Sequence, residues 1–110
     1  MPMFNDREVA FESKFAHDAE VRFHEIGRRN RLLGAWVAGK LGLTGQALAD
    51  YVASIVHEEV LNADDRLLVG KVVADLARGG HGLSEGDVAE KMQQLHDEAR
   101  LQLKSEPPPA

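Results

Sequence analysis

Residues 5–41 read NDREVAFESKFAHDAEVRFHEIGRRNRLLGAWVAGKL and decide the fold. The stretch contains no proline, and its apolar residues recur with the spacing of a helix. Asn5 and Glu8 are spaced as a capping pair, with Glu8 at the positive end of the helix dipole. Gly27 is a point at which the helix is weakened or broken, and Gly42 is a C-terminal stop. The sequence therefore predicts one long helix, from about residue 6 to about residue 41.

Three shorter helices follow, near residues 45–60, 64–78 and 85–103. Ser84 and Asp87 have the pattern of a capping box at the start of the last helix. Strand signals are nearly absent, because there is no sustained period-two alternation and no Asn-Gly or Asp-Gly hairpin turn. We therefore predict an all-α fold, a four-helix bundle-like domain with a long, partly mobile N-terminal helix.

Apolar residues at helical spacing mark the faces that we expect in the core. In the first helix a stripe begins at Phe11 and Phe15, and we expect its part from Phe23 onward to belong to the bundle. The later helices are expected to bury Leu48, Tyr51, Val52, Ile55, Val56, Leu67, Leu68, Val72, Leu76, Val88, Met92, Leu95, Ala99 and Leu103.

The composition indicates a soluble chain with few reactive groups. Of its 110 residues 44% are hydrophobic, and the net charge of -5 argues against attraction to nucleic acid or to an anionic membrane. The absence of cysteine excludes disulfides and thiolate chemistry. No apolar run reaches the roughly 18 residues of a membrane span, and the charged residues within 1–12 do not resemble a signal peptide. We expect a cytoplasmic protein.

All four phenylalanines lie within the first 23 residues. With the charged residues between them they form an amphipathic helix with aromatic anchors, which is a type of ligand that lays one face into a groove of a partner protein. The other interpretation is that they pack on the chain's own bundle, as apolar stripes usually do. The residues alone leave both interpretations open.

Arg28, Arg29 and Arg31 form a basic cluster near the middle of the long helix. Nucleic-acid binding is one interpretation of such a cluster. The pI of the chain is near 5.5, however, well below the basic range of nucleic-acid-binding modules. A solvated or ion-paired face is the better interpretation.

The sequence offers little to support a metal site or catalysis. His17, Glu20 and His24 share one side of the helix, but zinc normally takes four ligands and a supporting second shell. We interpret these residues as surface residues and predict no metal site. The chain also has no phosphate-binding loop of the Walker type and no nucleophile in a supportive context. We therefore expect no enzyme activity and no cofactor.

Two runs in the first helix are long enough to be specific for a protein family. They are Asp6-Arg7-Glu8 with Ala10-Phe11-Glu12-Ser13-Lys14-Phe15-Ala16-His17-Asp18, and Arg28-Arg29-Asn30-Arg31-Leu32-Leu33-Gly34 followed by Trp36. Together they resemble the zeta subunit family, the inhibitor subunit of alphaproteobacterial ATP synthase. Weaker similarity extends to the fourth helix.

The resemblance implies a four-helix protein whose N-terminal helix inhibits ATP hydrolysis. That helix would insert at a catalytic interface between the alpha and beta subunits of the soluble head and reach the rotor stalk. The implied division is a mobile inhibitory segment (1–19) and a helical bundle (20–104). The proline-rich tail (105–110) is expected to be disordered, because its three prolines cannot continue a helix. The partner-binding residues carried over by the resemblance are Phe4, Arg7, Glu8, Phe11, Glu12, Lys14, Phe15, His17 and Asp18.

Two other hypotheses remain at this point. The first is a small adenine-nucleotide-binding helical domain with a regulatory role, which would bind its ligand through Arg28, Arg29 or Arg31. The second is a structural adaptor without regulatory effect. The resemblance places the protein in the cytoplasm, peripheral on the membrane-bound ATP synthase, without direct membrane insertion.

Overall fold

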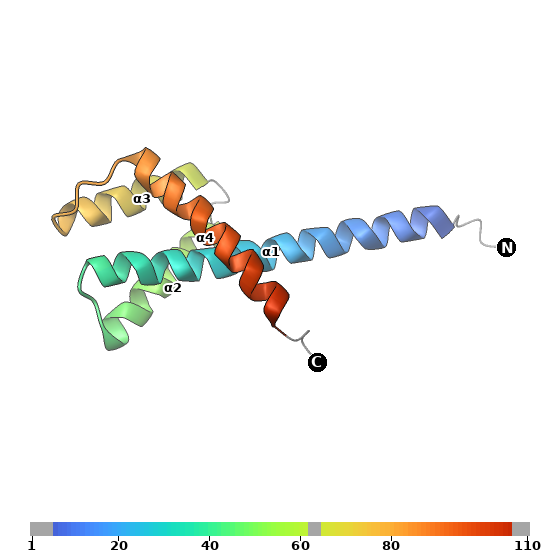
Figure 1. Ribbon diagram of the computed structural model, residues 1–110, viewed down its shortest axis with the longest axis horizontal. Coiled ribbons are helices and arrows are strands. Elements are labelled where there is room, and N and C mark those ends of the chain that lie inside the picture. The colour runs from blue at the N-terminus through green and yellow to red at the C-terminus, as the bar shows by residue number, and fades with distance from the viewer. Residues whose placement is uncertain (1–5, 62–64, 107–110) are drawn as a thin grey trace.

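The computed structural model describes the backbone of residues 6–61 and 65–106, and the side chains of residues 17–57 and 65–106. Within these ranges the chain forms four helices and no strand: α1 (Asp6–Lys40), α2 (Gly45–Leu61), α3 (Asp65–Arg78) and α4 (Glu85–Ser105) (Figure 1). The predicted all-α fold is confirmed, and each helix boundary lies within two residues of the predicted one. No described helix is both long and apolar enough to cross a membrane.

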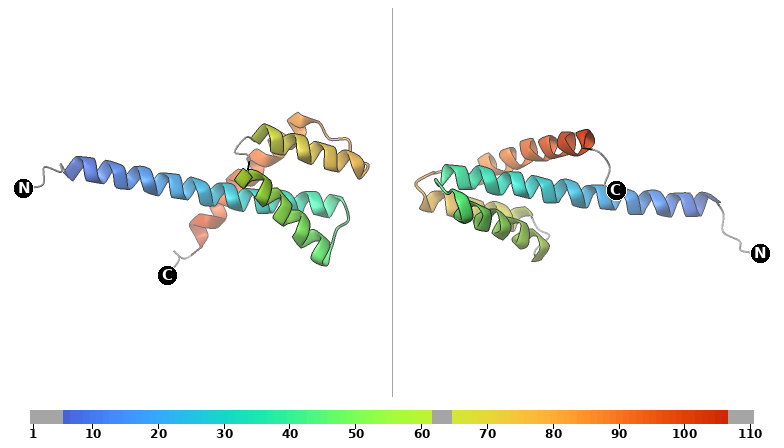
Figure 2. Two further views of the ribbon diagram at one scale, coloured as in Figure 1. Left: turned by 180° about the vertical axis from the view of Figure 1, so that it is seen from behind. Right: turned by 90° about the horizontal axis from the view of Figure 1, so that it is seen from below.

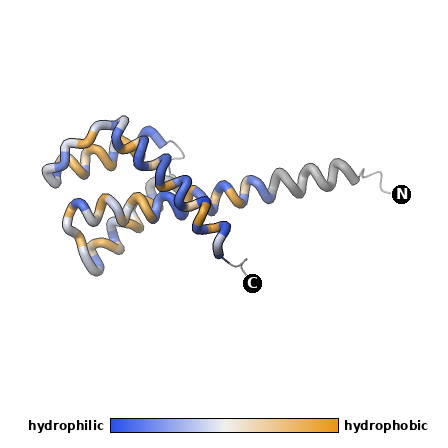
Figure 3. The backbone as a smooth tube through the Cα atoms, viewed as in Figure 1, coloured by the Kyte–Doolittle hydropathy of each residue, from blue (hydrophilic) through white to orange (hydrophobic). Residues whose placement is uncertain are grey.

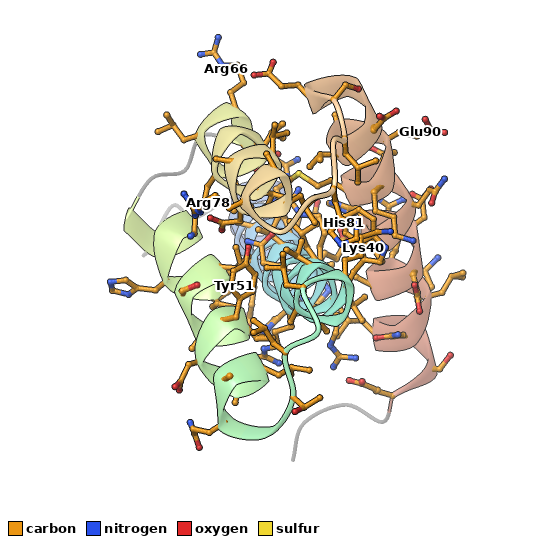
Figure 4. The ribbon with its side chains drawn as sticks, turned by 90° about the vertical axis from the view of Figure 1, so that its left-hand side faces the viewer. Lys40, Tyr51, Arg66, Arg78, His81 and Glu90 are labelled. Carbon is orange, nitrogen blue, oxygen red and sulfur yellow. The ribbon has the colours of Figure 1, made fainter. Side chains whose placement is uncertain are left out.

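The first helix sets the shape of the molecule. Its 35 residues correspond to about 52 Å of helix, and the chain measures 66 Å along its longest axis. The C-terminal half of α1 is surrounded by the other helices, with α2 and α4 on either side of it and α3 above (Figure 4). The N-terminal half extends away from this bundle in all three ribbon views (Figures 1 and 2).

The core consists of aliphatic side chains from all four helices. Polar and apolar residues are interspersed along the coloured part of each helix (Figure 3), as expected for helices that bury one face. Among the described side chains of α1, the fully buried apolar ones begin at Leu33. Beside it, α2 approaches so closely that a Cβ on Gly34 would lie 3.0 Å from the Val52 Cα. The buried cluster consists of Leu33, Val37, Ile55, Leu68, Val72, Leu76, Val88, Met92 and Leu95.

The turns follow the predicted capping chemistry. Gly42, with φ of 74°, ends α1, and the Leu43 amide donates to the Ala38 carbonyl at 2.9 Å, as in a Schellman motif. At the start of α4 the Ser84 hydroxyl accepts from the Asp87 amide and the Asp87 carboxylate accepts from the Ser84 amide. The capping box predicted there is confirmed.

Four expectations need correction. α1 is continuous through Gly27 rather than broken there. Phe23 and Leu67, which were expected in the core, are 69% and 53% exposed, so helical spacing alone misplaced them. α4 continues to Ser105, and Glu106 forms an ion pair with α1. These two residues therefore do not belong to a disordered tail, while residues 107–110 lie outside the described part of the chain.

Candidate protein-binding surface

Residues 17–24 of α1, called here the projecting stretch, are all exposed. Two of them are large apolar residues, Val21 at 40% exposure and Phe23 at 69%. The Phe23 ring meets the His24 ring edge to face, with 6.0 Å between centroids, and His24 lies 3.7 Å from the Glu20 carboxylate. A helix that is exposed all round and carries a bare aromatic ring is suited to contact with another protein.

Only two of the predicted partner-binding side chains can be placed. His17 and Asp18 are exposed, at the start of the projecting stretch. The structure therefore gives both side chains free access to a partner. The remaining predicted side chains lie outside the part of the chain whose side chains are described: Phe4, Arg7, Glu8, Phe11, Glu12, Lys14 and Phe15.

A groove runs between the projecting stretch and the C-terminal half of α4. It has a volume of about 660 Å³ and includes His17, one of the predicted residues. Val21 from α1 and Leu103 from α4 are its apolar residues. The remaining lining residues are polar or charged: Glu20, His24, Glu25, Arg28, Arg100, Lys104 and Glu106.

Polar contacts with α4 begin where the projecting stretch ends. The Glu25 carboxylate lies 3.4 Å from His96 Nε2 and 3.3 Å from Arg100 Nε. One turn further along α1, Arg28 pairs with Glu106 at 2.6 Å and donates to the Gln102 side chain at 3.0 Å. Hydrogen bonding within this pair raises the pKa of Arg28 and lowers the pKa of Glu106. Sequence reasoning singled out Arg28 but missed these pairings, because the partners are 71 or more positions apart.

The three arginines proposed for nucleotide binding do not share one environment. Arg28 faces α4, as above, whereas Arg29 is buried and binds the Asp65 carboxylate of α3 at 3.0 Å. Arg31 is exposed. A phosphate would have to compete with carboxylates of this chain for Arg28 and Arg29, so the arrangement favours the ion-paired interpretation of the cluster.

No metal site is found among the described side chains. His17, Glu20 and His24 do lie on the projecting stretch, but no group of three or more potential ligands there or elsewhere in the described residues could hold an ion.

Asp75 is a buried carboxylate that the sequence analysis did not single out. It accepts from the Tyr51 hydroxyl of α2 at 2.7 Å and from Lys71 at 3.1 Å, and it pairs with Arg78. Tyr51 and Arg78 lie between α2 and α3 in Figure 4. Burial, and then the bond to Asp75, raise the pKa of Tyr51. The spacing of Lys71, Asp75 and Arg78 is the only sequence signal of this network. Its role is to join α2 to α3.

Comparison with known families settles the family of the chain. The family model for ATPase inhibitor subunit zeta matches residues 1–102, nearly the whole chain. The chain belongs to the zeta family. The resemblance read from the first helix is thereby confirmed, and with it an inhibitory, regulatory family function. Neither the curated proteins nor the solved structures contain a match to this zeta-family chain.

Proposed function

We propose that this chain inhibits ATP hydrolysis by inserting the N-terminal part of α1 at a catalytic alpha/beta interface of the ATP synthase head, close to the rotor stalk. The observation that carries the proposal is that the N-terminal half of α1 projects from the bundle, and that its described side chains, residues 17–24, are all exposed. Family membership supplies the inhibitory function, and the projection supplies a means of reaching a partner. The protein would thus be held at the membrane by its partner and not by a segment of its own.

The dimensions of α1 suit an inserted element. From Asp6 to His24 the helix spans about 28 Å, enough to cross a cleft between two subunits while the bundle stays outside. A helix that is already formed before binding has less ordering entropy to lose on insertion. Residues 1–19 would form the inserted segment, and exposed His17 and Asp18 would lie at its outer end.

Inhibition of rotation requires a preference for one state of the partner. A bound helix shifts an equilibrium only by its difference in affinity between states. The segment would therefore bind one rotational state of the head more tightly than the others, and it would oppose hydrolysis more than synthesis. Phe11 and Phe15 are proposed as the apolar anchors, and the charged residues between them as positioning groups.

The test is the hydrolysis rate of the isolated ATP synthase head as the protein is titrated in. Truncating an interface anchor costs about 2 kcal/mol or more, so Phe11→Ala and Phe15→Ala should each weaken inhibition by roughly thirty-fold. Leu67→Ala is a matched control, because Leu67 is an exposed apolar residue on α3, outside the proposed segment. Equal inhibition by all variants, or no inhibition by the parent chain, would refute the proposal.

A further inference from the structure

Gly27 lies in α1 at the point where the helix leaves the bundle. A Cβ placed on it would meet nothing within 4 Å, so close packing does not require glycine there. Relative to alanine, glycine weakens a helix interior by an amount that corresponds to about a five-fold change in an equilibrium constant. The helix from Asp6 to Gly27 is about 31 Å long, and a bend of ~10° at its base would displace the tip by ~5 Å. The direction of the projecting helix thus depends on whether the backbone bends at Gly27.

The contacts from α4 bracket this weak position. Glu25 on one side of Gly27 pairs with His96 and Arg100, and Arg28 on the other side pairs with Glu106. Glu25 and Arg28 are one helical turn apart, so α4 contacts the same face of α1 on both sides of the glycine. Figure 1 shows α4 crossing α1.

The α1 side chains of these contacts are sheltered from solvent. The Glu25 side chain is 14% exposed and Arg28 23%, and on α4 His96 is 19% exposed, whereas Arg100 and Glu106 are 48% and 46% exposed. Ion pairs with one sheltered member are less screened by salt than pairs in which both members are fully exposed. A further pair joins Arg29, the residue after Arg28, to Asp65 of α3. The base of the projecting helix is therefore tied to two helices within a single turn.

We infer that the C-terminal half of α4 is a splint across Gly27, and that Glu25 and Arg28 are positioning residues that fix the direction of the inhibitory helix. The inference rests on the function proposed above. A fixed direction would present the helix to its partner without a search over orientations, so that little rotational freedom is lost on insertion. The bundle then contributes to inhibition without contacting the catalytic interface.

The splint can be tested by reversing its charges. Glu25→Lys with Arg28→Glu places like charges opposite Arg100 and Glu106 and leaves the net charge of the chain unchanged. Because the chain has no cysteine, spin labels can be attached through Ala19→Cys and Ala53→Cys, both at exposed positions. The distance distribution between the labels reports the direction of the projecting helix relative to α2. Glu90→Lys, an exposed reversal on the outer side of α4, is the control (Figure 4).

The parent chain and the control should give a narrow distribution, and the reversal variant a broad one. A backbone residue that is free before binding must be ordered on binding, which lowers the binding constant by a factor of about five or more. The reversal should therefore weaken inhibition about five-fold. Adding Gly27→Ala to the reversal should narrow the distribution and restore inhibition, because alanine stiffens the helix itself. If the reversal lowers the melting temperature, the distance distribution can be measured again in the milder variant with Glu25→Gln and Arg28→Gln.

Two results would overturn the splint. One is an unchanged distance distribution in the reversal variant. The other is weaker inhibition by Gly27→Ala in the parent chain, since the glycine would then be needed as a hinge. If the parent chain does not inhibit at all, the proposed function fails, but the distance distributions still decide whether α4 fixes the direction of α1.

Discussion

Phe23 is the residue for which the helical pattern and the structure disagree most. The change in unfolding free energy caused by Phe23→Ala shows which of the two is right. The stripe of apolar residues in α1 places it in the core, whereas the side chain is 69% exposed. Full burial of a phenylalanine contributes about 1.5–3 kcal/mol, so the covered third of this one contributes at most about 0.5–1 kcal/mol. Alanine has the higher helix propensity, by about 0.5 kcal/mol. The free energy of unfolding should therefore change by no more than about 0.5 kcal/mol.

Leu33→Ala, two to three turns further along the same helix, is the matched comparison. Leu33 has no exposed surface, and truncating a buried leucine costs about 2–5 kcal/mol. At about 4–8 °C per kcal/mol for a domain near this size, its melting temperature should fall by at least about 8 °C. The melting temperature of Phe23→Ala should stay within a few degrees of the parent value.

Urea denaturation followed by circular dichroism measures both variants, and the slope of the transition shows whether the unfolded surface has changed. A loss of 2 kcal/mol or more in Phe23→Ala would refute the reasoning. It would mean that the projecting stretch folds against the bundle and that its apolar residues belong to the core.

Three further predictions concern the bundle. Burial and the bond to Asp75 raise the folded-state pKa of Tyr51, so the free energy of unfolding should decline as the pH rises above about 10. In Tyr51→Phe the midpoint of urea denaturation should decline less over the same pH range. Gly34→Val should destabilise the fold by about 1–3 kcal/mol by forcing α2 away, with a clearly smaller loss for Gly39→Val, whose surroundings are open. Ser84→Ala should cost about 1 kcal/mol by removing the cap of α4, and an unchanged thermal midpoint would contradict this.

Local signals in the sequence were sufficient to predict most of the fold. Gly42 and the capping box at Ser84 mark helix ends by chemistry that acts within a few residues, and the structure confirms both. Periodicity also identified Val88, Met92 and other buried positions of α4. These predictions succeeded because a short window of residues determines each of them.

Periodicity could not show where the bundle ends along α1. Phe23 continues the apolar stripe of the helix, yet its side chain is 69% exposed. A pattern within one helix carries no information about its neighbours. The contacts at the base of the projecting helix were unpredictable for the same reason, since Glu25 and Arg100 are 75 positions apart. The anchors Phe11 and Phe15 came from family resemblance, and they remain a prediction.

The central claim is that the N-terminal part of α1 inhibits while the bundle folds without it. The most direct measurement compares the intact chain with a chain lacking residues 1–16, by ATP hydrolysis of the isolated head and by thermal unfolding of each protein. Among the described side chains of α1, from His17 onward, the buried ones begin at Arg29. We therefore expect the shortened chain to melt within a few degrees of the intact one and not to inhibit. Inhibition by the shortened chain, or a collapse of its melting transition, would contradict the account.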